Sequence, residues 1–326
     1  MRRPQFDQGP LLVRWACCTK HILFDQTTTE TLLRYLQHEE QIRIKQFRFN
    51  KDKALALVGR LLLRTFLYYY GVDLVASDNS LSRRPTWWDI QLGRTPENKP
   101  VLVHNENATT SIPWPENLHF NLSHHGSWVV FSAGRVEKLG IDVSRIERPL
   151  NETVGDYLNW FEEQFTPFEW QTIRAHPSHE LLQLAQFHRH WCLKESYVKA
   201  EGVGLNLDLR RIEFYNVAPS VVDPPCERTA HTVPVNTLES GVRVRFDHVP
   251  QPEWQFEMYY VDAEHPVALA YVVNPSTSTE ASNSEPLQQK SHAHHINPDR
   301  SCPPCLTLLT LDQILEWLPA DLGPEM

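Results

Sequence analysis

Apolar side chains recur every three or four positions along residues 51–70. The residues at this spacing are Leu55, Val58, Leu62, Phe66 and Tyr69. This is the period of one buried face of an α-helix, and Gly71 directly after it predicts the end of the helix. A weaker helical pattern covers residues 28–47, and the apolar run at residues 11–16 predicts a strand before it.

The middle of the chain changes to the shorter period of strands. Three short strands are predicted near residues 118–123, 128–133 and 139–144, with glycine turns between them. If the three form an antiparallel meander, Ser123 and His124 at the end of the first strand lie close to the third strand. Residues 77–117, which precede them, are rich in Pro, Ser and Asn, which favours loops and extended segments.

A second helical region covers residues 152–200 and stops near Gly202 and Gly204. Four strand-like segments follow it: LRRIEFY, VRVRFD, WQFEMYYV and VALAYVV. Residues 275–305 are too poor in apolar side chains to fold on their own. The last segment, TLLTLDQILEW, predicts a short amphipathic helix at the end of a flexible tail.

This order of elements predicts an α+β protein made of two similar α+β lobes in a pseudo-twofold arrangement. The first lobe is expected at residues 1–145 and the second at residues 146–274. Each contains a long helix followed by strands. Residues 275–326 are expected to form a low-complexity tail with the short terminal helix.

Composition narrows the class of protein. The 326 residues are 41% hydrophobic and 22% charged, as in soluble globular proteins, and the net charge of −9 argues against a general nucleic-acid binder. The most apolar segment is interrupted by Arg60 and Arg64, so no membrane span is expected. Six irregularly spaced cysteines and the lack of an apolar leader indicate reduced thiols in the cytoplasm.

Two carboxylates and a lysine are the leading candidates for chemistry. In FHRHWCLKESYVKAEGVG, residues 187–204, Glu195 and Lys199 lie one helical turn apart; alone, this spacing is more typical of a surface ion pair. In the strand GIDVS, alternation places Asp142 on the face opposite Ile141 and Val143. Mg²⁺ is usually held by one or two carboxylates together with substrate oxygens and water, and Asp142 and Glu195 offer such a pair.

Polar and basic residues elsewhere fit an anionic ligand. His124 follows Asn121 and Ser123 at a strand end and is a candidate phosphate donor, a role that the adjacent His125 fits equally well. The basic residues upstream are Arg43, Lys45, Arg48, Lys51, Lys53, Arg94 and Lys99. Most such residues are solvated surface charges, yet near a metal–phosphate groove they would bind an anion.

Two other motifs carry less weight. SHAHH at 291–295 and CPPC at 302–305 offer His and Cys at loosely zinc-like spacing inside the predicted tail. Cys192 has apolar neighbours along its helix and is interpreted as a packed residue rather than a nucleophile.

Three segments in this order, FNLSHHGSWVVFSAG, LGIDVS and FHRHWCLKESYVKAEGVGLNLDLRRIEF, resemble the phosphopantetheinyl transferases. The similarity is to the larger, monomeric, two-lobed type and within it to eukaryotic cytosolic members, and it covers roughly residues 11–274. The resemblance implies Mg²⁺-dependent transfer of the 4′-phosphopantetheine arm of coenzyme A to a serine of an apo acyl or peptidyl carrier protein. The active site is then expected in the cleft between the lobes.

The resemblance also implies a role for each matching residue. Asp142 and Glu195 would hold Mg²⁺ on the pyrophosphate, and Lys199 would bind that pyrophosphate and stabilise the leaving group. His124, with Ser123 and Asn121 beside it, would contact coenzyme A phosphates. Arg43 and Arg94 would bind the adenosine 3′-phosphate end, and Lys99 would assist. The serine proton would pass to Glu195 directly or to a water molecule.

The chain departs from the family pattern at two places. Ser144 stands where bacterial members have a third carboxylate, and Asn98 precedes Lys99-Pro100 where many members have glycine. Two other classes of function are compatible with the same residues: a catalytically silent adaptor that binds coenzyme A or a carrier protein, and a hydrolase of the pyrophosphate. Carriers of the fatty-acid synthase, aminoadipate reductase and polyketide synthase types are all candidate partners.

Overall fold

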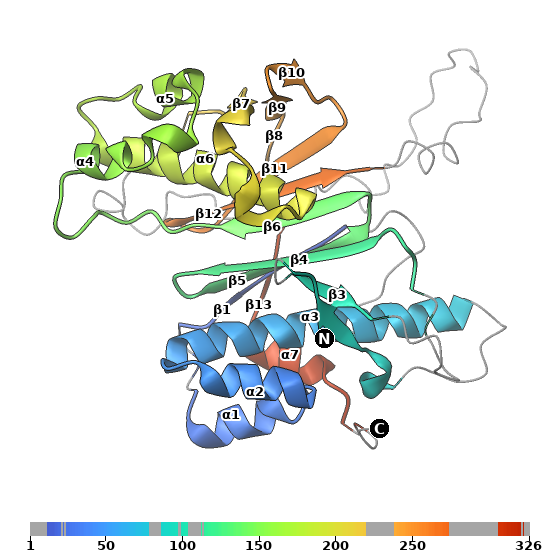
Figure 1. The fold of residues 1–326 in the computed structure, drawn as a ribbon. Coiled ribbons are helices and arrows are strands. Elements are labelled where there is room, and N and C mark those ends of the chain that lie inside the picture. Colours follow the sequence, from blue (N-terminus) through green and yellow to red (C-terminus); the bar gives the residue numbers. More distant parts are fainter. Residues whose placement is uncertain are drawn as a thin grey trace, which may run out of the picture.

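The computed structural model describes residues 12–20, 22, 24–77, 86–96, 99–103, 112, 114–219, 238–273, 306–320 and 322. Figure 1 shows two lobes that meet through their sheets, each with a long helix on its outer side. The layers run in the order helix α3, first sheet, second sheet, helix α6. This arrangement confirms the predicted two-lobed α+β architecture. None of the helices formed by these residues is long and apolar enough to cross a membrane.

The first lobe is built on a four-stranded sheet. Its strands, in spatial order, are β13 (Thr307–Leu309), β1 (Leu12–Cys18), β5 (Trp128–Arg135) and β4 (Leu118–His125). The helices that cover it are α1 (Gln26–Leu33), α2 (His38–Gln46) and α3 (Asn50–Ser77). A small hairpin of β2 (Leu92–Arg94) and β3 (Pro100–Leu102) follows the short helix η1 (Trp87–Asp89). The predicted stripe of α3, which includes Leu55, Leu62 and Phe66, lies in the core of this lobe.

Gly71 does not end the long helix, so the prediction at this position was wrong. Helix α3 continues through it to Ser77. A Cβ atom at Gly71 would lie 3.0 Å from the Trp114 ring, which shows why the residue is small. The glycine makes room for close packing between the helix and a loop rather than for a left-handed turn.

The second lobe is built on a sheet in the spatial order β6 (Lys138–Val143), β12 (His265–Val272), β11 (Trp254–Asp262) and β8 (Glu239–Ser240). Helix α6 (Glu180–Glu201) covers its outer face and ends at Gly202, whose φ of 73° is the left-handed conformation of a helix cap. The smaller elements around it are α4 (Val154–Asn159), η2 (Glu162–Gln164), α5 (Pro167–Ile173), η3 (Gly204–Asn206), η4 (Leu209–Arg211), β7 (Ile212–Tyr215), β9 (Arg243–Phe246) and β10 (Val249–Pro250).

The predicted three-strand meander does not form. Strand β6 pairs with β12 of the second sheet, whereas β4 and β5 pair in the first. The two sheets pack face to face through buried side chains such as Val130, Ile141 and Leu269. Because this packing still places β6 against β4, the expected proximity of Ser123 to the third strand is confirmed, although the reason given for it was wrong. The predicted boundary between the lobes, at residues 145 and 146, stays a prediction. Strand β6, which precedes this boundary in the chain, already belongs to the second sheet.

The end of the chain returns to the first lobe. The predicted terminal helix is present as α7 (Leu311–Trp317), and β13 before it pairs in parallel with β1. Ile314 and Trp317 are buried in the same core as α3, and the Tyr69 hydroxyl donates a hydrogen bond to the Trp317 carbonyl at 2.7 Å. Residues 306–320 are therefore part of the first lobe rather than the end of a separate tail.

Candidate functional site

Strand β6 and helix α6 lie unusually close together, and Gly140 is the reason. A Cβ atom at position 140 would lie 2.0 Å from the Ser196 carbonyl oxygen and 2.5 Å from the Ala200 amide nitrogen. Since no side chain fits there, the helix backbone rests directly on the strand. Alternation along β6 then directs the next same-face residues, Asp142 and Ser144, toward the same helix.

Asp142 lies in a short polar network that joins the two lobes. Its Oδ1 atom accepts a hydrogen bond from the Ser123 hydroxyl at 2.7 Å. The same atom forms an ion pair with Lys199 Nζ at 2.5 Å. Lys199 also donates to Ser123 at 2.9 Å. Ile141 and Val143 face the opposite way into the core between the sheets. The predicted orientation of Asp142 is thus confirmed.

Glu195 lines the same cavity as Asp142 and Lys199. The cavity has a volume of about 420 Å³ and is lined at this end by Ser123, His124, Asp142, Glu195 and Lys199. Burial raises the pKa of Glu195 above its usual value, and the nearby Asp142 carboxylate raises it further, while Lys199 acts in the opposite direction. Burial and Lys199 both lower the pKa of His124. A neutral His124 can donate one N–H to an anion.

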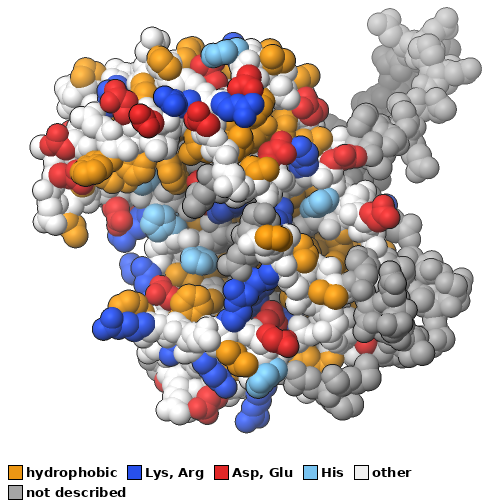
Figure 2. All heavy atoms as spheres, viewed as in Figure 1, with side chains coloured by type: hydrophobic (Ala, Val, Ile, Leu, Met, Phe, Trp, Pro, Cys, Tyr) orange, Lys and Arg blue, Asp and Glu red, His pale blue; other side chains and the backbone are white. Residues whose placement is uncertain are grey.

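A second cavity, of about 970 Å³, joins the first at His124 and extends over the first lobe. Arg43, Arg60 and Arg94 line it together with Glu40. Figure 2 shows Lys, Arg and His side chains gathered along the band between the lobes, despite the acidic net charge of the chain. The two cavities together form a groove with positive charge at one end and a carboxylate–lysine cluster at the other.

Arg60 is a groove residue that the sequence analysis missed. Burial and, to a smaller extent, the nearby Arg94 lower its pKa to about 10, whereas Glu40 favours the charged form. Its Nε atom lies 3.7 Å from the Glu40 carboxylate. The available signal is an arginine within an apolar helix, a pattern that by itself indicates only that the segment does not span a membrane. A charged side chain at such a position needs an anion nearby, and the groove provides the space for one.

The other predicted residues are placed as follows. Lys99 reaches the last turn of α6, where its Nζ donates to the Lys199 carbonyl at 3.1 Å. Asn121 is buried, and its side-chain oxygen accepts from the Ile141 amide at 3.1 Å, so it fixes β4 to β6 and is not among the residues that line the two cavities. His125 lines the first cavity beside His124, but its Nδ1 accepts from the Arg145 amide at 3.2 Å. Cys192 is fully buried, as interpreted.

Asp142 and Glu195 are the residues suited to a metal ion. Among the described residues, no group of three or more His, Cys, Asp or Glu is placed to hold one. Two carboxylates on one open cavity nevertheless match the number that Mg²⁺ takes from a protein when phosphates and water complete its shell. The zinc-like motifs at 291–295 and 302–305 lie outside the described residues.

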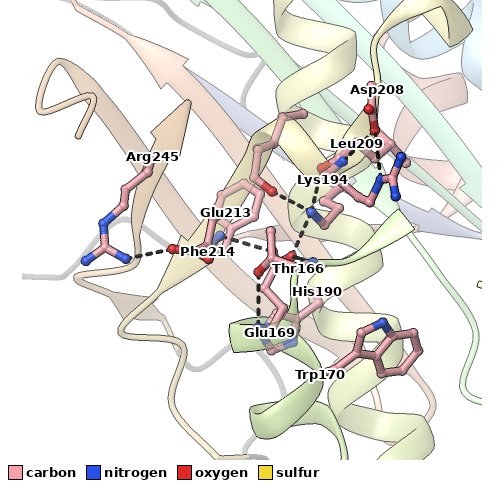
Figure 3. A network of polar contacts seen from close by, with 12 residues as sticks. Thr166, Glu169, Trp170, His190, Lys194, Asp208, Leu209, Glu213, Phe214 and Arg245 are labelled. Atoms are coloured by element: carbon pink, nitrogen blue, oxygen red, sulfur yellow. Dashed lines mark hydrogen bonds and ion pairs between the residues drawn. The ribbon is translucent and has the colours of Figure 1, made fainter. Parts of the chain in front are cut away.

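A buried ion pair behind the cavity fixes helix α6 in place. Lys194, next to Glu195, is completely buried and pairs with the equally buried Glu169 at 2.8 Å (Figure 3). Lys194 also donates to the carbonyls of Leu209 at 2.8 Å and Ile212 at 2.5 Å, and Glu169 accepts from the Phe214 amide at 3.0 Å. All three Lys194 protons are used. This network ties α6 to α5, η4 and β7 and so sets the direction in which Glu195 points.

We expect Lys194→Met to destabilise the protein by about 3–5 kcal/mol, because it leaves the Glu169 carboxylate buried without its cation. Adding Glu169→Gln should restore part of this loss, since glutamine can still accept from the Phe214 amide. Arg211→Met, which breaks the exposed pair with Asp247, should cost far less, because solvent screens that pair. Denaturant unfolding of the four proteins tests this; equal losses for Lys194 and Arg211 would contradict it.

Comparison with known proteins covers both lobes. Residues 25–136 match the family model described as 4′-phosphopantetheinyl transferase, N-terminal. Residues 138–270 match the model of the 4′-phosphopantetheinyl transferase superfamily. The junction between the two matches falls where the chain passes from β5 in the first sheet to β6 in the second.

Curated relatives are similar over most of the chain. The L-aminoadipate-semialdehyde dehydrogenase-phosphopantetheinyl transferase of Homo sapiens is 34% identical over 258 residues, which cover 79% of this chain and 74% of the relative. A phosphopantetheinyl transferase of Thraustochytrium sp. is 31% identical over a region that covers 72% of this chain and 69% of the relative. A 4′-phosphopantetheinyl transferase of Emericella nidulans is 28% identical over 66% of this chain and 69% of the relative.

Proposed function

The chain belongs to the 4′-phosphopantetheinyl transferase superfamily, and from this premise we propose that it transfers the phosphopantetheine arm of coenzyme A to a carrier-protein serine. The observation that carries the proposal is the convergence of Asp142, Glu195 and Lys199 on one cavity beside an arginine-lined groove. That groove has the charge and the extent for a long anionic cofactor with phosphates at two places. The two products of this transfer are the holo carrier and adenosine 3′,5′-bisphosphate.

The reaction is a displacement at the β-phosphorus of coenzyme A. The serine oxygen forms a new bond to this phosphorus, the bond to the bridging oxygen breaks, and the bridging oxygen leaves with adenosine 3′,5′-bisphosphate. Lys199 would stabilise the charge that develops on this leaving oxygen. The serine proton would pass to Glu195, directly or through a water molecule.

Each end of coenzyme A has a proposed set of partners. His124 and Ser123 would bind the pyrophosphate at the junction of the two cavities. Arg43 and Arg94 would bind the adenosine 3′-phosphate, and we add Arg60 to this set because it lines the same groove. Lys99 would act at the rim, through its contact with the end of α6.

Asp142 and Glu195 fit a magnesium ion, and we propose that they hold it. The donor set supports this, because two carboxylates face a cavity where pyrophosphate oxygens would lie. A bound Mg²⁺ would neutralise negative charge on the pyrophosphate. The Lys199 ammonium pairs with the Asp142 carboxylate at the same place.

The direct test is intact-mass spectrometry of an apo acyl carrier protein incubated with the purified protein, coenzyme A and Mg²⁺. We expect the mass of the carrier to rise by one phosphopantetheine group. If the mass does not rise with several carriers although coenzyme A binds tightly, the protein is instead a catalytically silent adaptor. The family assignment and the presence of Asp142, Glu195 and Lys199 together argue against this alternative. The aminoadipate enzyme in the name of the human relative suggests a carrier of that pathway as the first to try.

A third cavity is the proposed approach of the carrier serine. It has a volume of about 440 Å³ and shares Trp191 and Glu195 with the first cavity, so Glu195 stands between the two. Leu207 and Leu209 line it together with Glu163, Asp208 and the exposed Arg210, whose Nε atom lies 3.6 Å from the Asp208 carboxylate. Carriers of this family are typically acidic, so a cation here would favour their docking. Monomeric state and a cytoplasmic location stay predictions.

We expect Arg210→Glu to raise the KM for the carrier by about fivefold and to leave the KM for coenzyme A unchanged, because the carrier alone meets this rim. The increase should shrink at high salt. Arg211→Glu is the matched control, since the neighbouring Arg211 points to Asp247 and does not line the cavity. Steady-state kinetics at two salt concentrations decide this; equal effects of the two substitutions would contradict docking at this rim.

A further inference from the structure

The end of strand β4 is held against the second lobe by its side chains. The strand runs beside β6 where the two lobes meet (Figure 1). Asn121 and Ser123 bond to residues of β6, and the His125 Nδ1 atom accepts from the Arg145 amide just after β6. These three residues alternate along β4, so His124 between them is directed to the other face, and it lines both the first and the second cavity. The direction of His124 therefore depends on how the end of this strand is held.

The turn from β4 to β5 meets two polar residues of the second lobe, Asp262 and His265, which flank the turn between β11 and β12. The Asp262 Oδ2 atom accepts from the Trp128 indole N–H at 2.7 Å, and Oδ1 accepts from His265 Nδ1 at 2.7 Å. Trp128 is the first residue of β5 and lies opposite His125 in the hairpin. One carboxylate thus connects the two lobes directly beside the turn that follows His124.

The Asp262 carboxylate is charged and held in one orientation. Burial raises the pKa of Asp262, but the hydrogen bond and the charge of His265, together with the N–H groups of Trp128 and Glu264, outweigh burial and lower this pKa to about 2. The Glu264 amide donates to Oδ1 at 2.8 Å. Three donors therefore fix a carboxylate that stays ionised at neutral pH, so the Trp128 indole always meets a negatively charged acceptor.

The His265 ring also packs against the turn itself. Gly126 has a φ of 60°, and a Cβ atom there would lie 2.3 Å from His265 Nε2. This nitrogen is buried and has no hydrogen-bond partner within the described part of the chain. A buried polar atom without a partner lowers stability, so the stability of the fold alone does not explain a histidine here. Features that lower stability in this way are typical of functional sites.

We propose that Asp262 and His265 are positioning residues for the transfer: they hold the turn after β4 and thereby set the direction of His124 toward the pyrophosphate of coenzyme A. This inference rests on the proposed function, in which His124 binds that pyrophosphate. Neither Asp262 nor His265 lines any of the three cavities described above. Each therefore acts on the ligand through the turn and not by direct contact.

A double-mutant cycle on coenzyme A binding tests this role. Calorimetric titration with coenzyme A and Mg²⁺ compares the wild type with Asp262→Ala, His124→Ala and the double variant. Each single substitution should weaken binding by about threefold to tenfold. The double variant should bind less than about twofold more weakly than His124→Ala alone, because Asp262 acts through His124. Additive losses would overturn the proposal, as would an unchanged affinity in Asp262→Ala.

A second connection between the lobes provides the matched control. Arg14 of β1 donates to both carboxylate oxygens of Glu257 in β11, each at 2.6 Å. Glu257→Gln weakens this connection without touching the turn, so any loss of coenzyme A affinity should add to that of His124→Ala. If Glu257→Gln is instead coupled to His124 as strongly as Asp262→Ala is, the effect is a general one of lobe contact and the proposal is wrong.

Trp128→Phe is the milder variant, because it keeps an aromatic ring and removes only the N–H that Asp262 accepts. It should show a smaller loss with the same lack of additivity, and it decides the question if thermal unfolding shows that Asp262→Ala does not fold. Full coenzyme A affinity in Trp128→Phe would then overturn the proposal.

The proposed function can fail separately from this inference. If the wild type binds coenzyme A but transfers nothing to any carrier, the transferase assignment fails, while the binding cycle still decides whether Asp262 acts through His124. If the wild type transfers phosphopantetheine but the losses are additive, only the positioning role is wrong. A wild type that binds no coenzyme A would refute both.

Discussion

Glu195→Gln is expected to lower the rate of phosphopantetheine transfer by about 10³-fold, and Asp142→Asn to do nearly the same. Glutamine keeps the size of the side chain but removes the negative charge and the capacity to take a proton. Both carboxylates face one cavity, and Lys199 pairs with Asp142 there, so the loss of either charge changes the site where the pyrophosphate would lie. The rate of carrier mass gain measures the effect.

A structural explanation of that loss can be separated from a chemical one. Glu201→Gln is the matched control, because Glu201 lies near the end of the same helix but pairs with Lys138 at 2.7 Å outside the cavity. This variant should transfer at close to the wild-type rate. Thermal unfolding of Glu195→Gln should stay within a few degrees of wild type, since an uncharged group at a partly buried position removes a desolvation cost. A fully active Glu195→Gln protein would refute the assigned role.

The directions of the candidate-site side chains were predictable where a local rule fixes them. Alternation along GIDVS was enough to orient Asp142, and the four-residue spacing of Glu195 and Lys199 placed both on one side of α6. What the sequence did not reveal was the contact between the two elements. That contact depends on Gly140, where the absence of a side chain lets the helix backbone approach the strand.

The errors arose where a residue has several physical uses. Gly71 was interpreted as a helix end, but small size, rather than backbone freedom, is what its contact with Trp114 requires. Arg60 was considered only as an obstacle to a membrane span, because its role depends on Arg43 and Arg94 from other segments. Strand β6 was assigned by chain order to its neighbour, although its partner β12 lies far along the sequence. Long-range pairing of this kind leaves no local signal.

Removing residues 306–326 is expected to prevent stable folding of the first lobe. The segment contributes strand β13 to the sheet and buries Leu309, Ile314 and Trp317 in the lobe core. Trp317 packs against Trp15 with ring centroids 5.6 Å apart. Loss of a single buried tryptophan side chain costs about 3–5 kcal/mol. Since a typical domain is stable by only about 5–15 kcal/mol, loss of the whole segment should exceed what the lobe can tolerate.

The same reasoning predicts how the defect reaches the candidate site, although no residue of the segment lines the cavities described above. Strand β1, which pairs with β13, also pairs with β5, and β5 pairs with β4, which carries Ser123 and His124. We expect Trp317→Ala to lower the unfolding midpoint by several degrees, and the truncated chain to lose both cooperative unfolding and coenzyme A binding. A chain ending at residue 322 retains every described residue and should behave as wild type. If the chain truncated before residue 306 folds cooperatively and binds coenzyme A normally, the terminal strand and helix are an accessory layer rather than part of the core.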